Sequence, residues 1–367
     1  MLNIGLVGCG DISGIYIQNM RDVFSREIKL IAVCDLIKER AEKAKNAYGD
    51  CKIYDTMEEL FADPDVDIVL NLTRPYQHYG VTKGALLAGK HAYSEKPLAA
   101  SLEEGRELVN IAKEKGLFLG GAPDTFMGGS IATCRKLIDE GVVGDIIGGR
   151  AAMICHGHES WHPDPDFYYQ YGGGPLFDMG PYYITALINM IGGIKAVTGK
   201  AATTFAERTI TSKQHYGEII KVNTPTHIDA ILSFENGANV SLLTTFDAYK
   251  ESQAFFELYG TKGTILVPDP NFFDGEIKIF TPETGALLRY PIQYGYTANS
   301  RALGLADAAR AIETGRNGRT TYKQTLHVLE VMSAILTSSN EGRTVGIESH
   351  FEREAPMNAS LPVGILE

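Results

Sequence analysis

Asp178 and Tyr182 form a carboxylate–phenol pair, four residues apart, directly after the glycine run Gly172–Gly174. Both groups can hold a proton or pass it on, so together they could serve acid–base chemistry. A spacing of four residues puts the two side chains on one face of a helix. We expect that helix to continue through "PYYITALINMIG", because proline is tolerated in a first helical turn. The glycines would let the backbone approach a ligand.

The elements that must position such groups begin at the N-terminus, where short apolar runs alternate with amphipathic stretches. The candidate strands cover residues 3–8, 29–34, 66–72, 90–94 and 117–121. The candidate helices cover residues 12–24, 37–49, 76–89 and 101–116. Alternation of this kind predicts an α/β fold, a doubly wound parallel sheet with helices on both faces.

A glycine turn joins the first strand to the first helix. In "GCGDIS", Gly8 and Gly10 occupy the first two positions of a dinucleotide-binding turn, and a serine stands where the third glycine would be. Such glycines let the backbone approach a pyrophosphate, which then lies on the N-terminus of the helix. We therefore assign Gly8, Gly10, Asp11 and Ile12 to a cofactor site. The alternative is a tight turn that uses glycine only for its shape.

Asp35 ends the second strand, in "IAVCDL". A carboxylate at this place accepts hydrogen bonds from the ribose hydroxyls of the adenosine and repels a 2′-phosphate. The next residues, Leu36 and Ile37, could not hold such a phosphate. NAD is therefore favoured over NADP. Asp35 could also cap the following helix, since aspartate caps well.

Two later loops follow strands at the same edge of the predicted sheet, and open α/β sheets bind ligands beyond the carboxyl ends of their strands. "TRPYQHYG" supplies Thr73, Pro75 and His78, and "SEKPLA" supplies Glu95 and Lys96. We assign all five to the cofactor site. Lys96 would lie where a nicotinamide meets its substrate, although a lone lysine in a loop is more often a plain surface residue.

These motifs, taken in order, resemble the Gfo/Idh/MocA family, the glucose-fructose oxidoreductase and inositol dehydrogenase-like enzymes. The resemblance rests on "GCGDIS", Asp35, "TRPYQH", "EKP" and "GGGPLFDMG", and it covers essentially the whole chain. It implies an N-terminal Rossmann domain, residues 1–122, that carries NAD or NADP. It also implies a C-terminal α/β domain, residues 123–367, whose large, mostly antiparallel open sheet binds substrate and builds homodimers or homotetramers.

The resemblance further implies that Lys96 and Asp178 are catalytic, because they match the family's E-K-P lysine and D-x-G aspartate. The sequence departs from the family pattern at Tyr182, which stands where D-x-G-x-H has its proton-transferring histidine. Hydride transfer from a secondary alcohol to nicotinamide also requires moving the hydroxyl proton. A tyrosine with an ordinary pKa of about 10 is poorly suited to this, but a neighbouring ammonium group would lower that pKa.

Three interpretations of Tyr182 are open. In the first, a Tyr182–Lys96 pair is the acid/base, and Asp178 orients the lysine or the sugar hydroxyl. In the second, Lys96 acts alone and Tyr182 binds substrate. In the third, Tyr182 is a half-buried ring that packs between the domains. The neighbouring Tyr183 is expected in the core.

Beyond residue 123 the pattern changes to strands joined by hairpin turns. Asn236-Gly237 joins two alternating runs, which is a strong hairpin signal, and a Gly-Thr-Lys-Gly turn repeats the scheme. Residues 321–338 form an amphipathic pattern that predicts a long helix, with Leu326, Leu329, Met332 and Ile335 on its apolar stripe. We expect this helix to pack back on the first domain.

The segment 155–171 is rich in histidine and aromatic residues and directly precedes the glycine run. We expect Trp161 and His162 to bind the substrate, together with Tyr182, because rings stack on the apolar faces of sugars and imidazoles bond their hydroxyls. The histidine spacing matches no metal-binding pattern, so no metal is predicted. A loop that packs against a neighbouring subunit is the alternative.

Composition narrows the class of protein. The formal net charge is −11 and no basic patch is visible, which argues against a nucleic-acid partner. No run reaches the roughly 18 apolar residues of a membrane span. Five cysteines without metal-like spacing are typical of reduced thiols. The chain begins with strand-like residues rather than a signal sequence. These features favour a cytoplasmic protein with a small-molecule substrate.

The expected activity is that of an NAD(P)-dependent oxidoreductase that moves a hydride between nicotinamide and a secondary hydroxyl of a sugar, cyclitol or related polyol. Two alternatives stay open. One is a glycosidase- or epimerase-like enzyme that retains NAD and oxidises its substrate transiently. The other is a non-catalytic sensor of sugar or nucleotide, although such a sensor would have no need of both Lys96 and Asp178.

Overall fold

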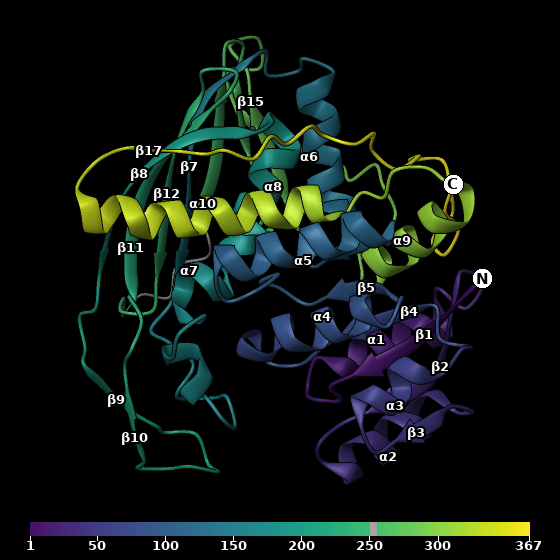
Figure 1. Ribbon diagram of the computed structural model, residues 1–367. Helices are drawn as coiled ribbons and strands as arrows, with labels where there is room; N and C mark the ends of the chain where they lie inside the picture. The colour runs from purple at the N-terminus through teal and green to yellow at the C-terminus, as the bar shows by residue number, and fades with distance from the viewer. Residues whose placement is uncertain (250–254) are drawn as a thin grey trace. The chain divides into compact units, whose positions relative to one another are not determined.

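A computed structural model describes residues 1–249 and 255–367 of the chain. Contacts divide the chain into two compact units (Figure 1). The first comprises Met1–Gly129, Tyr294–Leu329 and Glu354–Glu367, and the second comprises Ser130–Gln293 and Glu330–Arg353. Each unit has its own central sheet.

The sheet of the first unit is parallel throughout and has the strand order β3-β2-β1-β4-β5-β6. Its strands are β1 (Leu2–Val7), β2 (Ile28–Cys34), β3 (Lys52–Tyr54), β4 (Ile68–Asn71), β5 (His91–Ser94) and β6 (Leu119–Gly121). This is the doubly wound order of a Rossmann fold, which confirms the predicted α/β class. Every residue of β4 is buried, as expected for a central strand covered on both faces.

Helices connect these strands. They are α1 (Ser13–Asp22), α2 (Lys38–Tyr48), α3 (Met57–Ala62), α4 (His78–Leu87) and α5 (Leu102–Lys115), with short 3₁₀ turns η1 (Pro75–Gln77) and η2 (Thr125–Met127). β3 and α3 are not among the elements predicted from the sequence. Each is too short to show a clear hydrophobic period, although Thr56 and Glu59 form a capping box that marks the start of α3.

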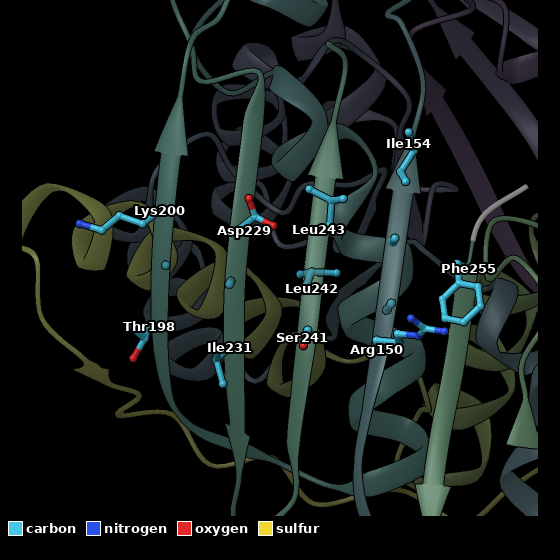
Figure 2. A pocket seen from close by; sticks show the side chains of 14 residues that line it. Arg150, Ile154, Thr198, Lys200, Asp229, Ile231, Ser241, Leu242, Leu243 and Phe255 are labelled. Carbon is cyan, nitrogen blue, oxygen red and sulfur yellow. The ribbon is translucent and has the colours of Figure 1, made fainter. Parts of the chain in front are cut away.

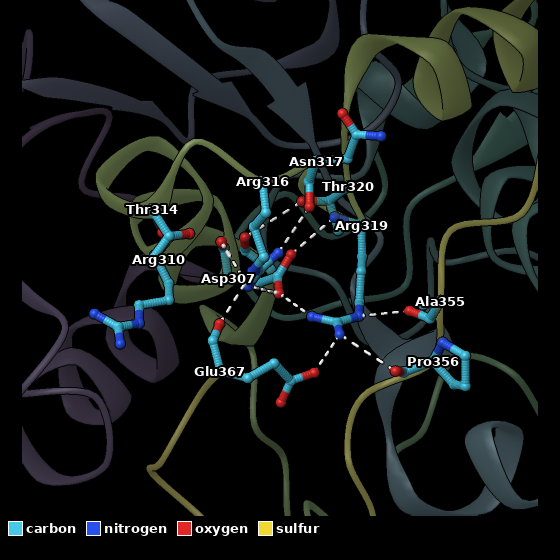
Figure 3. A network of polar contacts seen from close by, with 11 residues as sticks. Asp307, Arg310, Thr314, Arg316, Asn317, Arg319, Thr320, Ala355, Pro356 and Glu367 are labelled. Carbon is cyan, nitrogen blue, oxygen red and sulfur yellow. Dashed lines mark hydrogen bonds and ion pairs between the residues drawn. The ribbon is translucent and has the colours of Figure 1, made fainter.

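Two distant segments complete the first unit. One contains α9 (Leu303–Thr314), and the other is the C-terminal stretch Glu354–Glu367. Figure 3 shows the polar network that ties them together around Asp307, which is fully buried. Asp307 accepts hydrogen bonds from Arg316 and Arg319, and Arg319 donates onward to the carbonyl oxygens of Ala355 and Pro356. The buried carboxylate is thus fully paired, and it fixes the C-terminal stretch to the unit.

The second unit is built on a nine-stranded sheet with the order β16-β15-β14-β13-β7-β12-β11-β8-β17. Neighbouring strands are antiparallel except for β7 and β12, which confirms a large, mostly antiparallel sheet. The strands are β7 (Ile146–Ile154), β8 (Ile194–Ala202), β11 (His227–Phe234), β12 (Asn239–Thr245), β13 (Phe255–Gly260), β14 (Thr264–Leu266), β15 (Ile277–Phe280), β16 (Leu287–Tyr290) and β17 (Val345–Gly346). A separate hairpin pairs β9 (Glu207–Thr209) with β10 (Ile219–Lys221).

Both predicted hairpin turns are present. Asn236-Gly237 joins β11 to β12, and Gly237 has a φ of +93°, which favours glycine. The segment from Gly260 to Gly263 joins β13 to β14. The sheet register follows from these turns, and it sends alternate side chains to opposite faces.

One face of this sheet is covered and the other is open. The helices α7 (Gly174–Asp178) and α8 (Gly180–Ile191) pack on β11, β12 and β7. The other face displays Arg150, Thr198, Lys200, Asp229, Ile231 and Ser241 around a shallow cavity of about 700 Å³ (Figure 2). The alternation of buried and exposed residues along β8 and β11 matches these two environments.

The remaining helices among the described residues are α6 (Gly129–Asp139) and α10 (Tyr322–Glu341), with a 3₁₀ turn η3 (Asp166–Tyr169). The helix α10 confirms the element predicted at 321–338, and Leu329, Met332 and Ile335 on its stripe are buried. The boundary between the two units falls inside it, after Leu329. All five cysteines are free thiols. Within the described ranges, none of the helices combines the length and apolar character that crossing a membrane requires.

Candidate active site

The glycine turn after β1 is shaped by a close approach of backbone to backbone. Gly8 has a φ of +92°, and a Cβ there would lie 2.8 Å from the carbonyl carbon of Leu72 and from the nitrogen of Thr73. A Cβ at Gly10, in contrast, would meet nothing within 4 Å. Gly8 is therefore required by the fold itself, whereas the space beside Gly10 is open to a ligand. No side chain caps the N-terminus of α1, so that end of the helix suits an anion such as a pyrophosphate.

Asp35 holds the end of β2 to this turn. Its Oδ2 accepts a hydrogen bond from the backbone N–H of Cys9 at 2.6 Å, and its Oδ1 accepts one from the N–H of Ile37 at 2.8 Å. The bond to Ile37 is an Asx turn ahead of α2, so Asp35 is not the helix cap itself. A carboxylate can accept about four hydrogen bonds, which leaves capacity for ribose hydroxyls.

The loop after β4 is organised by Asn71, which sequence reasoning missed. Asn71 is 1% exposed, and its Oδ1 accepts hydrogen bonds from the backbone N–H and the hydroxyl of Thr73. Its amide donates to the carbonyl oxygen of His78 and to the hydroxyl of Thr82. Pro75 then opens η1. An asparagine at the end of a buried strand has no local signature beyond its burial, so only the fold reveals this role.

His78 joins the loops after β4 and β5. Its ring is 1% exposed, with Nδ1 2.6 Å from the carbonyl oxygen of Pro97 and Nε2 3.0 Å from that of Thr73. Burial lowers the pKa of the His78 imidazole. Both ring nitrogens therefore contact the chain's own carbonyl groups. His78 can contribute to a cofactor site only by positioning the two loops that it connects.

Glu95 anchors the E-K-P loop at the carboxyl end of β5. It is 7% exposed, and its Oε1 accepts a hydrogen bond from the Tyr16 hydroxyl at 2.7 Å, while Oε2 accepts one from the N–H of Lys96 at 3.0 Å. Burial and the Glu95 carboxylate raise the pKa of Tyr16 well above its usual value, so Tyr16 remains a hydrogen-bond donor. With Glu95 fixed inward, half-buried Lys96 is held at the strand edge that also carries Gly8 and Thr73.

In the second unit, Asp178 and Tyr182 do not share one continuous helix, and the expectation of a single helical face is wrong. Asp178 ends α7, Met179 breaks the helix, and Tyr182 lies in the first turn of α8. The break follows from Pro181, which has no N–H to continue the helical bonds and restricts the residue before it. Tyr182 is 7% exposed. Tyr183 is fully buried and donates to Asp269, which confirms that it belongs to the core.

The glycine run is constrained by the chain's own backbone. Gly172 and Gly174 have φ values of +78° and +76°. A Cβ at Gly173 would lie 2.6 Å from the carbonyl oxygen of Phe167, and one at Gly174 would lie 2.7 Å from that of Pro225. Gly173 and Gly174 are therefore required by close packing within the unit, and the expectation that the run makes room for a ligand stays a prediction.

The segment 155–171 lies beside Asp178. His158 Nε2 is 3.3 Å from Asp178 Oδ2, a contact that the sequence analysis did not anticipate. Trp161 is 62% exposed and His162 lies edge-on to it, so both predicted substrate residues sit in one cluster of rings. Their part in substrate binding stays a prediction. Across residues 1–249 and 255–367, His, Cys, Asp and Glu form no group of three or more that could hold a metal ion.

A buried ion cluster around Arg208 anchors the segment 155–171. Arg208 is 5% exposed, and its guanidinium donates to Glu159 at 2.8 Å, to Asp247, and to the carbonyl oxygen of Phe246 at 2.9 Å. Tyr169 donates its hydroxyl hydrogen to Glu159. The two carboxylates compensate the buried cation, which is the condition for keeping a charge inside a protein. Nothing in the local sequence marks Arg208, because its partners come from distant segments.

Comparison with known proteins identifies the family. Residues 2–121 match the Gfo/Idh/MocA model described as an oxidoreductase family with an NAD-binding Rossmann fold, and residues 131–266 match the model of its C-terminal domain. The chain belongs to the Gfo/Idh/MocA oxidoreductase family. Residues 2–121, which contain the six-stranded parallel sheet of the first unit, are therefore the Rossmann domain of that family.

Two of the relatives that the chain resembles are dehydrogenases named for a sugar and for an inositol. The chain is 29% identical to D-xylose dehydrogenase of Paenarthrobacter nicotinovorans over 63% of its own length, and 28% identical to scyllo-inositol 2-dehydrogenase (NADP(+)) of Bacillus subtilis over 54%. The chain spans 60% and 54% of the length of these relatives. A solved structure of levoglucosan dehydrogenase with NADH and levoglucosan has the same fold, with a TM-score of 0.80, 23% identity, and coverage of 95% of this chain and 99% of that one.

The two glycines of the first turn give a matched pair of variants. Gly8→Ala places a Cβ against the Leu72–Thr73 backbone at a positive φ, and we expect it to lower the free energy of unfolding by about 2 kcal/mol. Gly10→Ala meets no neighbour, so we expect a change of stability within about 0.5 kcal/mol and NAD binding at least about tenfold weaker. Denaturant unfolding and NAD titration measure both. A Gly10→Ala protein that binds NAD like the unmodified one would contradict the assignment of this turn to the cofactor.

Proposed function

We propose that the protein is an NAD-dependent dehydrogenase that oxidises a secondary hydroxyl of a sugar, cyclitol or related polyol. The observation that carries the proposal is the E-K-P loop, in which buried Glu95 and His78 hold Lys96 at the carboxyl edge of the Rossmann sheet. The dehydrogenase activities named for the D-xylose and scyllo-inositol relatives support the same substrate class. Asp35 supports NAD over NADP, because its carboxylate would repel a 2′-phosphate.

The proposed reaction breaks two bonds of the alcohol. The bonding pair of the C–H bond leaves as hydride, the O–H proton goes to a base, and the carbinol carbon becomes a carbonyl carbon. Bound NAD supplies the hydride acceptor. We assign the base to a Tyr182–Lys96 pair, in which the ammonium group favours the phenolate, and we assign Asp178 to orienting the lysine or the hydroxyl. Trp161 and His162 would then recognise the rest of the polyol.

The activity is tested by following absorbance at the near-ultraviolet band of reduced nicotinamide, with NAD or NADP and a panel of sugars and cyclitols. We expect substrate-dependent reduction of NAD in preference to NADP. In Lys96→Ala, kcat/KM should fall by about 10²- to 10⁴-fold, the usual contribution of a positioned acid/base. Tyr182→Phe should lose kcat to a similar extent if the phenol carries the proton, and should mainly raise KM if it only binds substrate.

Lys83→Ala is the matched control, because Lys83 pairs with Glu107 on the surface of the same unit. It should leave activity unchanged. A silent panel with NAD already bound to the purified protein would favour an enzyme that oxidises its substrate transiently. A silent panel without any cofactor binding would contradict the dehydrogenase.

We also propose that two copies of the chain associate through the open face of the nine-stranded sheet, to give a homodimer or a homotetramer. Ile231 is 46% exposed on this face, beside the opposed charges of Lys200 and Asp229, which are register partners on β8 and β11. A patch that carries both signs of charge and apolar surface can complement a second copy of itself about a two-fold axis.

Ile231→Arg puts a charge in the middle of this patch and should shift the protein toward monomer. Light scattering after size-exclusion chromatography measures the mass. Tyr216→Arg is the control, since Tyr216 is an exposed side chain away from the sheet, between β9 and β10, and it should leave the mass unchanged. An Ile231→Arg protein with the mass of the unmodified assembly would show that this face is not the interface.

A further inference from the structure

A histidine from outside the D-x-G motif lies against Asp178. His158 comes from the segment that follows β7, and its Nε2 is 3.3 Å from Asp178 Oδ2. The two side chains are 13% and 14% exposed, so water screens their interaction only partly. The position where the family motif has histidine carries Tyr182 in this chain. An imidazole from outside the motif therefore contacts the motif aspartate.

The ring of His158 is held in place by aromatic neighbours. Tyr168 and Phe246 lie edge-on to it, with ring centroids 4.3 Å and 4.7 Å away, and Trp161 lies at 5.2 Å. The backbone N–H of His158 donates to the Tyr169 hydroxyl at 3.3 Å. Contacts on several sides limit the rotation of the imidazole, so the orientation toward Asp178 is built into the packing.

The next residue, Glu159, fixes the backbone that carries His158. Glu159 is 8% exposed and pairs with Arg208, and its carbonyl oxygen accepts hydrogen bonds from the N–H groups of Thr211 and Ser212, both at 2.9 Å. The backbone that carries His158 is thus held by the buried ion pair of Glu159 with Arg208 rather than by a free loop.

We propose that His158 is a positioning residue for Asp178. In this role His158 replaces part of the function of the histidine that the motif lacks. His158 donates the Nε2 hydrogen to Asp178 Oδ2, which orients the carboxylate. The role in turnover rests on the dehydrogenase activity proposed above, whereas the pair itself does not.

The first test separates kcat from KM for alcohol oxidation. His158→Ala removes the hydrogen bond that orients Asp178, so we expect kcat to fall about tenfold while KM changes little. His158→Gln keeps a hydrogen-bond donor and should recover part of the lost kcat. His156→Ala makes the same change two residues away, where the ring stacks on Tyr249, and should keep the kcat of the unmodified protein. A His158→Ala protein with unchanged kcat would overturn the proposal.

The second test needs neither a substrate nor a His158 variant that folds. Nuclear magnetic resonance of protein labelled at the Cε1 carbon of its nine histidines gives one signal for each ring. Asp178→Asn replaces the carboxylate that contacts His158 Nε2, so the signal of one ring should change its chemical shift. Unchanged signals for all nine rings would refute the pair even in an active enzyme. A shifted signal in a protein without dehydrogenase activity would keep the pair and refute only the proposed function.

Discussion

The parallel arrangement of the Rossmann sheet is the constraint on which the cofactor side of this protein depends. In a parallel sheet, the loops that follow the strands lie at the same end of the sheet, beyond the carboxyl ends of the strands. The glycine turn after β1, Asp35 after β2, Thr73 after β4 and Lys96 after β5 are far apart in sequence, yet the strand order β2-β1-β4-β5 makes them neighbours. The backbone contact between Gly8 and the Leu72–Thr73 peptide shows how tightly two of these loops meet. The chemistry at this edge is therefore a consequence of topology, refined by a few buried polar side chains.

Those buried polar side chains share one physical property in both units. Asn71, His78 and Glu95 in the first unit and Arg208 in the second are all at most 7% exposed, and each is paired with backbone or with an opposite charge. Inside a protein, a satisfied polar group holds its partners rigidly, while an unsatisfied one is costly. Removing one member of a buried ion pair typically costs about 3–5 kcal/mol, because the other charge is left uncompensated. Rigid anchoring of this kind holds Lys96 and His158 in place, and both residues remain partly exposed to solvent.

Features with local rules could be predicted from the sequence, and features made by distant contacts could not. The glycine turn, the E-K-P loop and the Asn236-Gly237 hairpin each follow from the conformational needs of adjacent residues. The helix break at Met179 also follows from a local rule, the effect of Pro181 on the helix. The four-residue spacing of Asp178 and Tyr182 nevertheless favoured a single helix in the prediction. The Arg208 cluster and the contact between His158 and Asp178 join residues that lie 49 and 20 positions apart. The clamp of Arg319 on the C-terminal stretch spans 36 positions and more, so no window of sequence could reveal it.

We propose that Lys96 and Asp178 both contact the hydroxyl group that is oxidised. The decisive experiment is a crystal structure of the protein with NADH and a polyol that supports turnover. We expect one substrate oxygen within about 3 Å of both Lys96 Nζ and a carboxylate oxygen of Asp178, the ordinary hydrogen-bond distance. A polyol whose reacting oxygen lies near the nicotinamide but contacts neither Lys96 nor Asp178 would contradict it.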